Sequence, residues 1–232
     1  MTRRYRLLST IAVCTLTVIA MMGAAWWHME VSRQKILEDN ALAAAESYAV
    51  TCESLRSFYT TDVVSRVPQE HVRITHDYRA MKNAIPLPAT LTIRLAEEIG
   101  RKTDGFGVRL YSQYPFPWRR TKLDEFEGRA LEALTANPDK PYFDVSQIAG
   151  APHLRYAISD LTRPNCVPCH NNHPESPKRD WKAGDLRGVL SISVLLHGIR
   201  ASIEESFQYL LLYFLIGGIV LISAVIWALG RE

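Results

Sequence analysis

Two long runs without a charged residue, 7–27 and 207–230, constrain this chain more than any other feature. Each is about as long as the roughly 20 apolar residues that an α-helix needs to cross a bilayer. Three arginines precede the first run and Arg231 follows the second, whereas Glu30 and two further glutamates lie on the opposite sides. The positive-inside rule therefore predicts two transmembrane helices, with both termini in the cytoplasm and residues 28–206 outside it.

Each run has a competing interpretation. The small residues 23–25 would suit cleavage of a signal peptide, but the first run is longer than the 7–15 residues of a usual signal core, which favours a retained anchor. A domain of this size has no room to bury the second run as a core helix. The net charge is +3, and basic and acidic residues are mixed along the chain, so no nucleic-acid partner is expected.

The region 29–67 contains neither proline nor glycine and predicts a long helix that continues from the first span. Its apolar residues step by three and four, which indicates one buried seam. The seam comprises Ala41, Ala45, Tyr48, Cys52, Leu55 and Tyr59. It suits either a homodimer or packing on the domain's own sheet.

The rest of the region predicts an α+β fold with a small antiparallel sheet and flanking helices. Helical spacing covers 89–100 and 123–136. Alternating residues predict strands at 107–112, 142–148, 152–158 and 186–195, the middle two forming a hairpin about Ala149 and Gly150.

The sequence 165–170, Asn-Cys-Val-Pro-Cys-His, contains C-x-x-C-H, the attachment signature of a c-type haem. Two thiols at this spacing, Cys166 and Cys169, can each bond one vinyl group of the same porphyrin, which places His170 beneath the iron as an axial ligand. One motif predicts one covalent haem c. Because this haem is attached outside the cytoplasm, the motif agrees with the predicted topology.

Two other interpretations of the motif remain open. A zinc site needs four ligands, and no second pair stands at suitable spacing. A redox disulfide would place the motif at a helix start, whereas it is expected here between a strand and a polar loop. The sixth ligand of a haem iron is undecided among six residues: Cys52, His71, His76, Met81, His153 and His173. Cys52 stands out as a thiol without an evident partner in an oxidising compartment.

Residues 166–190 resemble the signature of a bacterial c-type haem family with a PAS-like fold, as do 85–90, 108–112 and 154–157. This family occurs as an exported sensing domain of kinases, chemotaxis receptors and cyclases, and as stand-alone proteins. The resemblance implies a periplasmic PAS-like domain, anchored in the inner membrane, with His170 as one axial ligand. In some members a cysteine of the N-terminal helix is the other ligand, which implies that role for Cys52.

Further cofactor contacts are expected in the loop 173–185 and beside it. Trp181 is expected to pack on the porphyrin. Arg187 is expected to neutralise a propionate, and so are the basic residues Lys178, Arg179 and Lys182. Tyr111 is placed near the haem by the resemblance alone.

The leading functional hypothesis is a haem-based redox or small-ligand sensor. As printed, the chain ends at Glu232 without an output domain, so a separate signalling or redox partner is expected. The alternative is a membrane-anchored electron-transfer cytochrome. A haem enzyme is not expected, because no distinctive distal acid–base pairing is found.

Overall fold

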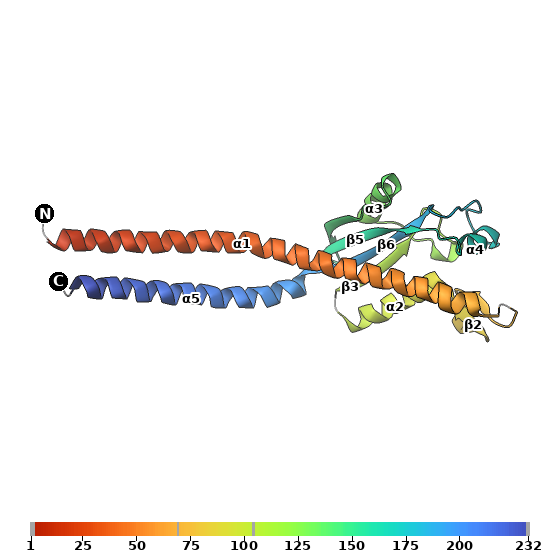
Figure 1. Ribbon diagram of the computed structural model, residues 1–232, viewed down its shortest axis with the longest axis horizontal. Coiled ribbons are helices and arrows are strands. Elements are labelled where there is room, and N and C mark those ends of the chain that lie inside the picture. The colour runs from red at the N-terminus through yellow and green to blue at the C-terminus, as the bar shows by residue number, and fades with distance from the viewer. Residues whose placement is uncertain (1–2, 69, 104, 231–232) are drawn as a thin grey trace. The chain divides into compact units, whose positions relative to one another are not determined.

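The computed structural model describes residues 3–68, 70–103 and 105–230 (Figure 1). The chain forms two compact units, one of Met1–Asp39 with His197–Glu232 and the other of Asn40–Leu196. The second unit holds most of the region 28–206 that the sequence assigns to one domain outside the membrane.

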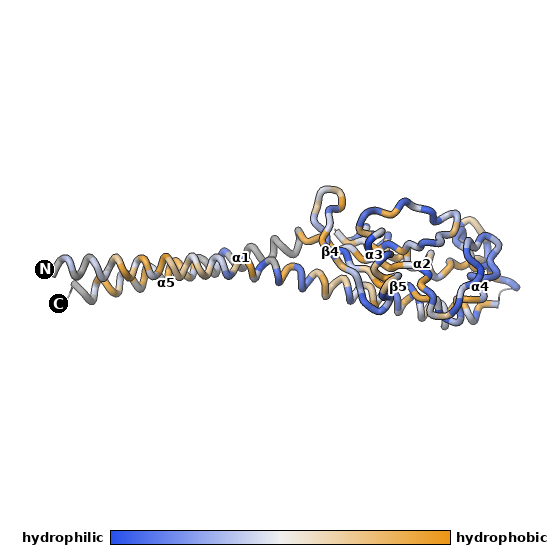
Figure 2. The backbone as a smooth tube through the Cα atoms, turned by 90° about the horizontal axis from the view of Figure 1, so that it is seen from above, coloured by the Kyte–Doolittle hydropathy of each residue, from blue (hydrophilic) through white to orange (hydrophobic). Residues whose placement is uncertain are grey.

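The first unit is made of helices from the two ends of the chain. It contains the first part of α1, Arg3–Phe58, and nearly all of α5, Leu196–Gly230. Within it the two helices approach closely, since a Cβ atom added to Gly218 would lie 3.2 Å from Val18 Cγ1. Apolar residues run along α5 (orange in Figure 2).

One helix among the described residues is long and apolar enough to cross a membrane, Ala12–Arg66 near the N-terminus. By composition it fits a membrane anchor or a signal sequence. Among the described residues the second run contributes only a shorter apolar helix, Leu212–Trp227, so the second transmembrane helix stays a prediction.

The second unit is an α+β domain, as predicted. After α1, a π-helical turn at Tyr59–Val63 and a 3₁₀ turn at Val64–Arg66 end the helix. The remaining helices are α2, Pro88–Lys102; α3, Glu125–Ala136; and α4, Val167–Asn172, with 3₁₀ turns at Tyr78–Ala80 and Pro117–Arg119. The strands are β1, Arg73–Thr75; β2, Ala84–Pro86; β3, Phe106–Tyr111; β4, Tyr142–Ile148; β5, Ala151–Leu161; and β6, Leu186–Leu195.

The main sheet is antiparallel and has the strand order β3-β6-β5-β4. Its β4–β5 hairpin is confirmed, and Ala149 and Gly150 at the turn both have positive φ angles, 51° and 79°, as a type I′ turn requires. A short parallel pair of β1 and β2, which the sequence did not indicate, forms a second sheet. The PAS-like fold class stays a prediction.

The two faces of the main sheet carry different helices (Figure 1). The α3 face holds the apolar core cluster of Tyr111, Phe126, Ala130, Leu134, Ala157 and Val189. Side chains alternate along a strand, so Leu154, Ile192 and Asp160 point to the opposite face, where α1 lies.

The buried seam of α1 differs from the predicted one. Its buried residues are Leu37, Ala41, Ala45, Ala49, Cys52 and Arg56. The predicted Tyr48 is 41% exposed, although its ring contacts that of Phe106 on β3. A straight helix repeats every 3.6 residues rather than 3.5, so the buried stripe drifts from Tyr48 to Ala49 and from Leu55 to Arg56. In the second unit this stripe packs on the domain's own sheet, and the homodimer stays a prediction.

A capping box begins α3 and yields a first testable prediction. Asp124 Oδ1 accepts a hydrogen bond from the Glu127 backbone N–H at 2.9 Å, and Glu127 Oε2 accepts one from the Asp124 N–H at 3.1 Å. We expect Asp124→Ala to lower the free energy of unfolding by about 1 kcal/mol. Hydrogen exchange of the α3 amides in the full-length protein measures this change, and an effect no larger than that of the exposed Asp139→Ala would contradict the prediction.

The same cap has a defined pH dependence. Burial raises the pKa of Asp124, but the Glu127 N–H and the Arg155 guanidinium outweigh it and hold this pKa below its ordinary value. A carboxyl with a depressed folded pKa stabilises the fold above its unfolded pKa of roughly 4. We therefore expect the difference between wild type and Asp124→Ala to shrink as the pH falls through the lowered folded pKa.

Candidate functional site

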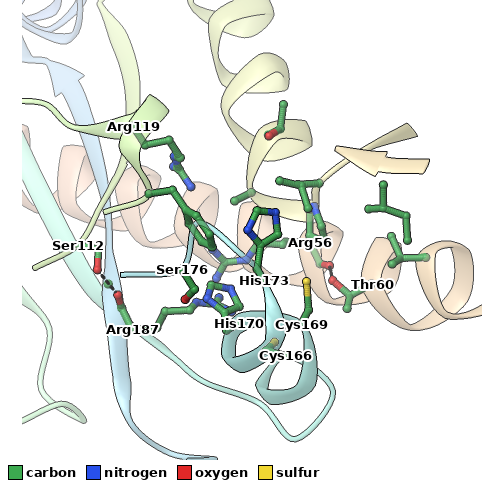
Figure 3. A pocket seen from close by; sticks show the side chains of 18 of the residues that line it. Arg56, Thr60, Ser112, Arg119, Cys166, Cys169, His170, His173, Ser176 and Arg187 are labelled. Atoms are coloured by element: carbon green, nitrogen blue, oxygen red, sulfur yellow. Dashed lines mark hydrogen bonds between the residues drawn. The ribbon is translucent and has the colours of Figure 1, made fainter. Parts of the chain in front are cut away.

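A cavity of about 790 Å³ lies within the second unit, on the sheet face that carries α1 (Figure 3). Its wall combines Arg56 and Thr60 at the end of α1, the end of β3, the segment 114–119, and α4. This volume falls in the range of roughly 300–1,000 Å³ that is usual for small-molecule and cofactor sites.

The three residues of the C-x-x-C-H motif line this cavity together (Figure 3). Cys166 is the N-cap of α4, and its carbonyl accepts a hydrogen bond from the His170 N–H at 3.1 Å. The turn before α4 is tied to the start of β6, since the Thr162 N–H donates to the Asp185 carbonyl at 2.8 Å. Local helix formation thus turns both thiols and the imidazole toward one space.

The structure corrects the predicted setting of the motif. The motif lies between β5 and the polar segment that precedes β6, as expected, but it also begins a short helix, α4, which the sequence did not indicate. Helix position therefore does not separate a haem site from a redox disulfide. Two observations favour a haem site over a redox disulfide. His170 lines the cavity beside the two thiols, and both thiols are free.

His170 is held as a neutral imidazole. Burial lowers its pKa to about 4, and the nearby positive charge of Arg187 adds to this effect. At neutral pH the ring is therefore unprotonated, which is the form that binds a metal ion.

Aromatic side chains surround His170. The Phe116 and Trp181 ring centroids lie 5.6 Å and 6.4 Å from that of His170. Trp181, predicted as a cofactor contact, is buried and lines the cavity. Its backbone N–H donates to Asn171 Oδ1 at 2.9 Å, and Asn171 Nδ2 donates to its carbonyl at 3.0 Å, so α4 holds the tryptophan in place.

Stacked aromatic rings lead from Phe116 to the surface of the domain. Phe116 stacks on Trp118 with centroids 4.7 Å apart, and Trp118 stacks on the exposed His76 at 4.1 Å. The sequence analysis assigned no functional role to residues 114–118. The signal that could have done so is the presence of large aromatic residues in this proline-rich segment.

Arg187, the predicted propionate partner, also lines the cavity and is held by a buried carboxylate. Its Nη2 donates to both oxygens of Asp160 at 2.8 Å, and its Nε donates to Asp160 Oδ2 at 3.1 Å. Arg56 Nη2 donates to Asp160 Oδ1 at 2.6 Å from α1. The other basic residues expected near a propionate, Lys178, Arg179 and Lys182, are not among the lining residues.

Tyr111 contributes both to the core and to the cavity. Its hydroxyl is buried and has no hydrogen-bond partner within the described part of the chain. Burial, with the charge of Glu127, raises the pKa of Tyr111 far above its ordinary value, so the hydroxyl stays protonated. The hydroxyl lies near Glu127 and Arg155 in the core of the α3 face, on the opposite side of the sheet from α1, so the haem contact expected of Tyr111 stays a prediction.

The six candidates for a sixth ligand separate by position. Met81 and His173 line the cavity. His71, His76, His153 and Cys52 do not. Cys52 is buried one helical turn before Arg56, on the same face of α1, and burial raises the pKa of its thiol.

Searches of curated proteins and of solved structures found no match. A family model described as Tll0287-like matches residues 33–194, which include the sheet, α4 and the C-x-x-C-H motif. The chain therefore belongs to the Tll0287-like family, a haem-related family.

Proposed function

We propose that residues 40–196 bind one c-type haem covalently through the thiols of Cys166 and Cys169. The observation that carries this proposal is the convergence of both thiols and the His170 imidazole on one cavity. When bound, the haem supplies an iron that can change its oxidation state and its axial ligands.

The residues of the cavity fit such a group. Two buried polar atoms of residues that line it lack a partner among the described residues, namely Arg56 Nη1 and Trp118 Nε1. The aromatic rings of Phe116, Trp118 and Trp181 supply apolar walls for a flat macrocycle. Within the described ranges, no group of three or more His, Cys, Asp and Glu side chains is arranged to hold a metal ion. A haem does not require one, because its iron takes only one or two ligands from the protein.

In the proposed site His170 is the proximal ligand, and Cys52 is the sixth ligand. Support for Cys52 is its buried place on the face of α1 that meets the cavity one turn later, at Arg56. Coordination requires its thiol to lose a proton and to reach the cavity. The π-helical turn at Tyr59–Val63, which directly follows α1, also contributes Thr60 to the cavity wall. Short π-helical turns of this kind are frequent at functional sites.

We infer that the domain is a redox or small-ligand sensor that signals through a separate protein, and that it is not an enzyme. A ligand on α1 would let a change at the iron bias the packing of this helix. We further propose that the N-terminal helix anchors the protein in the inner membrane, with its N-terminus in the cytoplasm and the domain in the periplasm, and that the protein is a homodimer.

Electron transfer is the second candidate, and the aromatic path favours it. His170, Phe116, Trp118 and His76 follow one another at centroid distances of 5.6, 4.7 and 4.1 Å, and His76 is exposed. A redox partner at His76 would meet this path.

The experiment that separates the two functions is spectroscopy of the full-length protein in detergent. We expect a low-spin ferric signal of the thiolate type, and carbon monoxide binding after reduction, when Cys52 leaves. Cys52→Ala is expected to remove the thiolate-type signal while the covalent haem remains. Cys14→Ala is the matched control, because this cysteine lies in the first unit.

The possible results distinguish the sixth ligand and the two functions. An unchanged ferric spectrum in Cys52→Ala would exclude Cys52 as the ligand. A wild-type spectrum that stays six-coordinate in both states and does not respond to carbon monoxide would favour electron transfer over sensing.

A further inference from the structure

Two residues that line the cavity each carry a buried nitrogen atom without a hydrogen-bond partner among the described residues. These atoms are Arg56 Nη1 and Trp118 Nε1. A buried N–H without an acceptor is costly, and the cost is larger when the group is charged. Arg56 is the charged one of the two, and its side chain is 6% exposed. The acceptor that Arg56 lacks is therefore the stronger pointer to a bound group.

Arg56 is held in place through its other terminal nitrogen. Its Nη2 donates to Asp160 Oδ1 at 2.6 Å, and Arg187 Nη2 in turn donates to both oxygens of Asp160 at 2.8 Å. A guanidinium group is a planar, rigid fork, so fixing Nη2 also fixes the direction of Nη1. Arg56 thus presents a preorganised, charged donor at the cavity wall.

Helix α1 and the two turns that follow it supply no other free side-chain donor to the cavity within the described ranges. Their other polar side chains in the wall are those of Thr60 and Ser65. The Thr60 hydroxyl donates to the Arg56 carbonyl at 2.7 Å, and the Ser65 hydroxyl donates to the Thr61 carbonyl. Arg56 Nη1 is therefore the donor that this wall has available for a bound group.

Arg56 lies beside the proposed sixth ligand. Cys52 precedes it by four residues on the same face of α1, and Cβ atoms at this spacing are roughly 5–6 Å apart. Burial raises the pKa of the Cys52 thiol and the charge of Arg56 opposes this rise, so the positive charge reaches the thiol. His170 belongs to α4, in another wall of the cavity (Figure 3). Arg56 and Cys52 thus share the side of the cofactor site that α1 supplies.

Trp118, the other residue with an unpartnered nitrogen, belongs to the aromatic group around His170. Its ring centroid lies 4.7 Å from that of Phe116 and 5.7 Å from that of His173. Phe116 lies 5.6 Å from His170. The indole N–H is uncharged and does not come from α1, so Trp118 provides a comparison for Arg56.

We propose that Arg56 is the hydrogen-bond donor to a small diatomic ligand that takes the place of Cys52 at the reduced iron, and that this ligand is dioxygen rather than carbon monoxide. The inference rests on the haem site and the departure of Cys52 proposed above, and it names the class of ligand sensed. In the exchange, one bond to the Cys52 sulfur is replaced by one bond to the ligand, and the electron comes from the reductant that is added.

The preference for dioxygen follows from charge. Dioxygen gains negative charge on its outer atom when it binds a ferrous haem, whereas carbon monoxide stays nearly neutral. A fixed, charged donor in the low-dielectric interior stabilises the more negative ligand more strongly. Arg56 therefore acts on specificity, through the hydrogen bond that its Nη1 has free.

The test uses the full-length holoprotein in detergent, reduced with dithionite and saturated with carbon monoxide. The carbon–oxygen stretching frequency, read by infrared spectroscopy, falls when positive charge lies beside the outer atom, so we expect Arg56→Gln to raise it. We also expect Arg56→Gln to lower the dioxygen affinity about tenfold, as the loss of one charged hydrogen bond implies. Flash replacement of carbon monoxide by dioxygen measures this affinity, and the carbon monoxide affinity is expected to change less.

Two further variants serve as controls. Arg119→Gln removes another positive charge from the cavity wall, in the segment after β3 rather than in α1. Trp118→Phe removes the other unpartnered donor. Both are expected to leave the frequency and the dioxygen affinity close to those of the wild type. Equal shifts in Arg56→Gln and Arg119→Gln would trace the effect to the overall charge of the cavity and overturn the inference.

The remaining outcomes separate this inference from the proposed function. An unchanged frequency and dioxygen affinity in Arg56→Gln that carries haem and binds carbon monoxide would overturn the inference and leave the sensor function intact. A change confined to the ferric thiolate-type signal would assign the Arg56 hydrogen bond to Cys52 and also overturn the inference. Reduced wild-type protein that binds neither gas would overturn the sensor function as well.

A second variant decides if Arg56→Gln does not accumulate. Arg56→Lys keeps the charge and the ion pair with Asp160, but its single nitrogen lacks the second arm of the guanidinium fork. A rise in the carbon–oxygen frequency and a loss of dioxygen affinity are still expected. Wild-type values of both in Arg56→Lys would overturn the inference.

Discussion

The double variant Cys166→Ala/Cys169→Ala is expected to carry no covalently bound haem. Both sulfurs face the same cavity as His170, and they are the groups able to bond the two vinyl carbons. Without them, haem can be held only by axial ligation and packing, which denaturation removes. Haem staining of the full-length protein on a denaturing gel should therefore fall from one haem per chain to background.

Single variants and a distant cysteine sharpen this result. Cys166→Ala and Cys169→Ala each leave one thioether possible, so a shifted pyridine haemochrome spectrum is expected from whatever haem remains. Cys14→Ala, in the first unit, should retain full staining. Staining that persists in the double variant would refute covalent attachment at this motif, and a Cys166–Cys169 disulfide in wild-type protein would support the redox-disulfide interpretation instead.

Removal of Asp160 is expected to be the most destabilising change at the site. Its side chain is 6% exposed and accepts hydrogen bonds from Arg56 and Arg187 at 2.6 and 2.8 Å. Burial raises the pKa of Asp160, but Arg187 and Arg56 outweigh it and keep the carboxyl ionised. Asp160→Ala leaves two buried guanidinium groups without their acceptor, which costs about 3–5 kcal/mol.

Hydrogen exchange of the β5 and β6 amides in the full-length protein measures this loss, with an expected acceleration of roughly a hundredfold or more for the most protected amides. Asp144→Ala is the matched control. Its carboxylate is 45% exposed and pairs with Arg129 at 2.9 Å, so a loss below about 1 kcal/mol is expected. Equal effects of the two substitutions would contradict the prediction, because the ion pairs of Asp160 with Arg56 and Arg187 would then contribute no more than an exposed pair.

The parts of the fold that depend on neighbouring residues were predictable. The hairpin about Ala149 and Gly150, the strand that became β6, and the helix from 123 to 136 follow from alternation, turn residues and helical spacing. The grouping of Cys166, Cys169 and His170 at one cavity was also predictable, because their spacing along the chain keeps the three residues together.

Parts that depend on small geometric differences were predicted only approximately. The seam of α1 was placed on the right helix but drifted by one residue, since a heptad count underestimates the helical repeat. Residues 207–230 were predicted to span a membrane from their lack of charge; among the described residues only the apolar N-terminal helix is long enough to do so, and the second span stays a prediction.

What the sequence by itself determined is the attachment motif, the α+β character and the apolar N-terminal helix, all of which arise from short-range patterns. Only the tertiary structure decided which charges meet. Arg56 and Asp160 are 104 residues apart in the chain, and no local pattern distinguishes them from exposed arginines and aspartates. Their partnership arises because α1 packs on the face of the sheet that presents Asp160, and burial then makes each charge require the other.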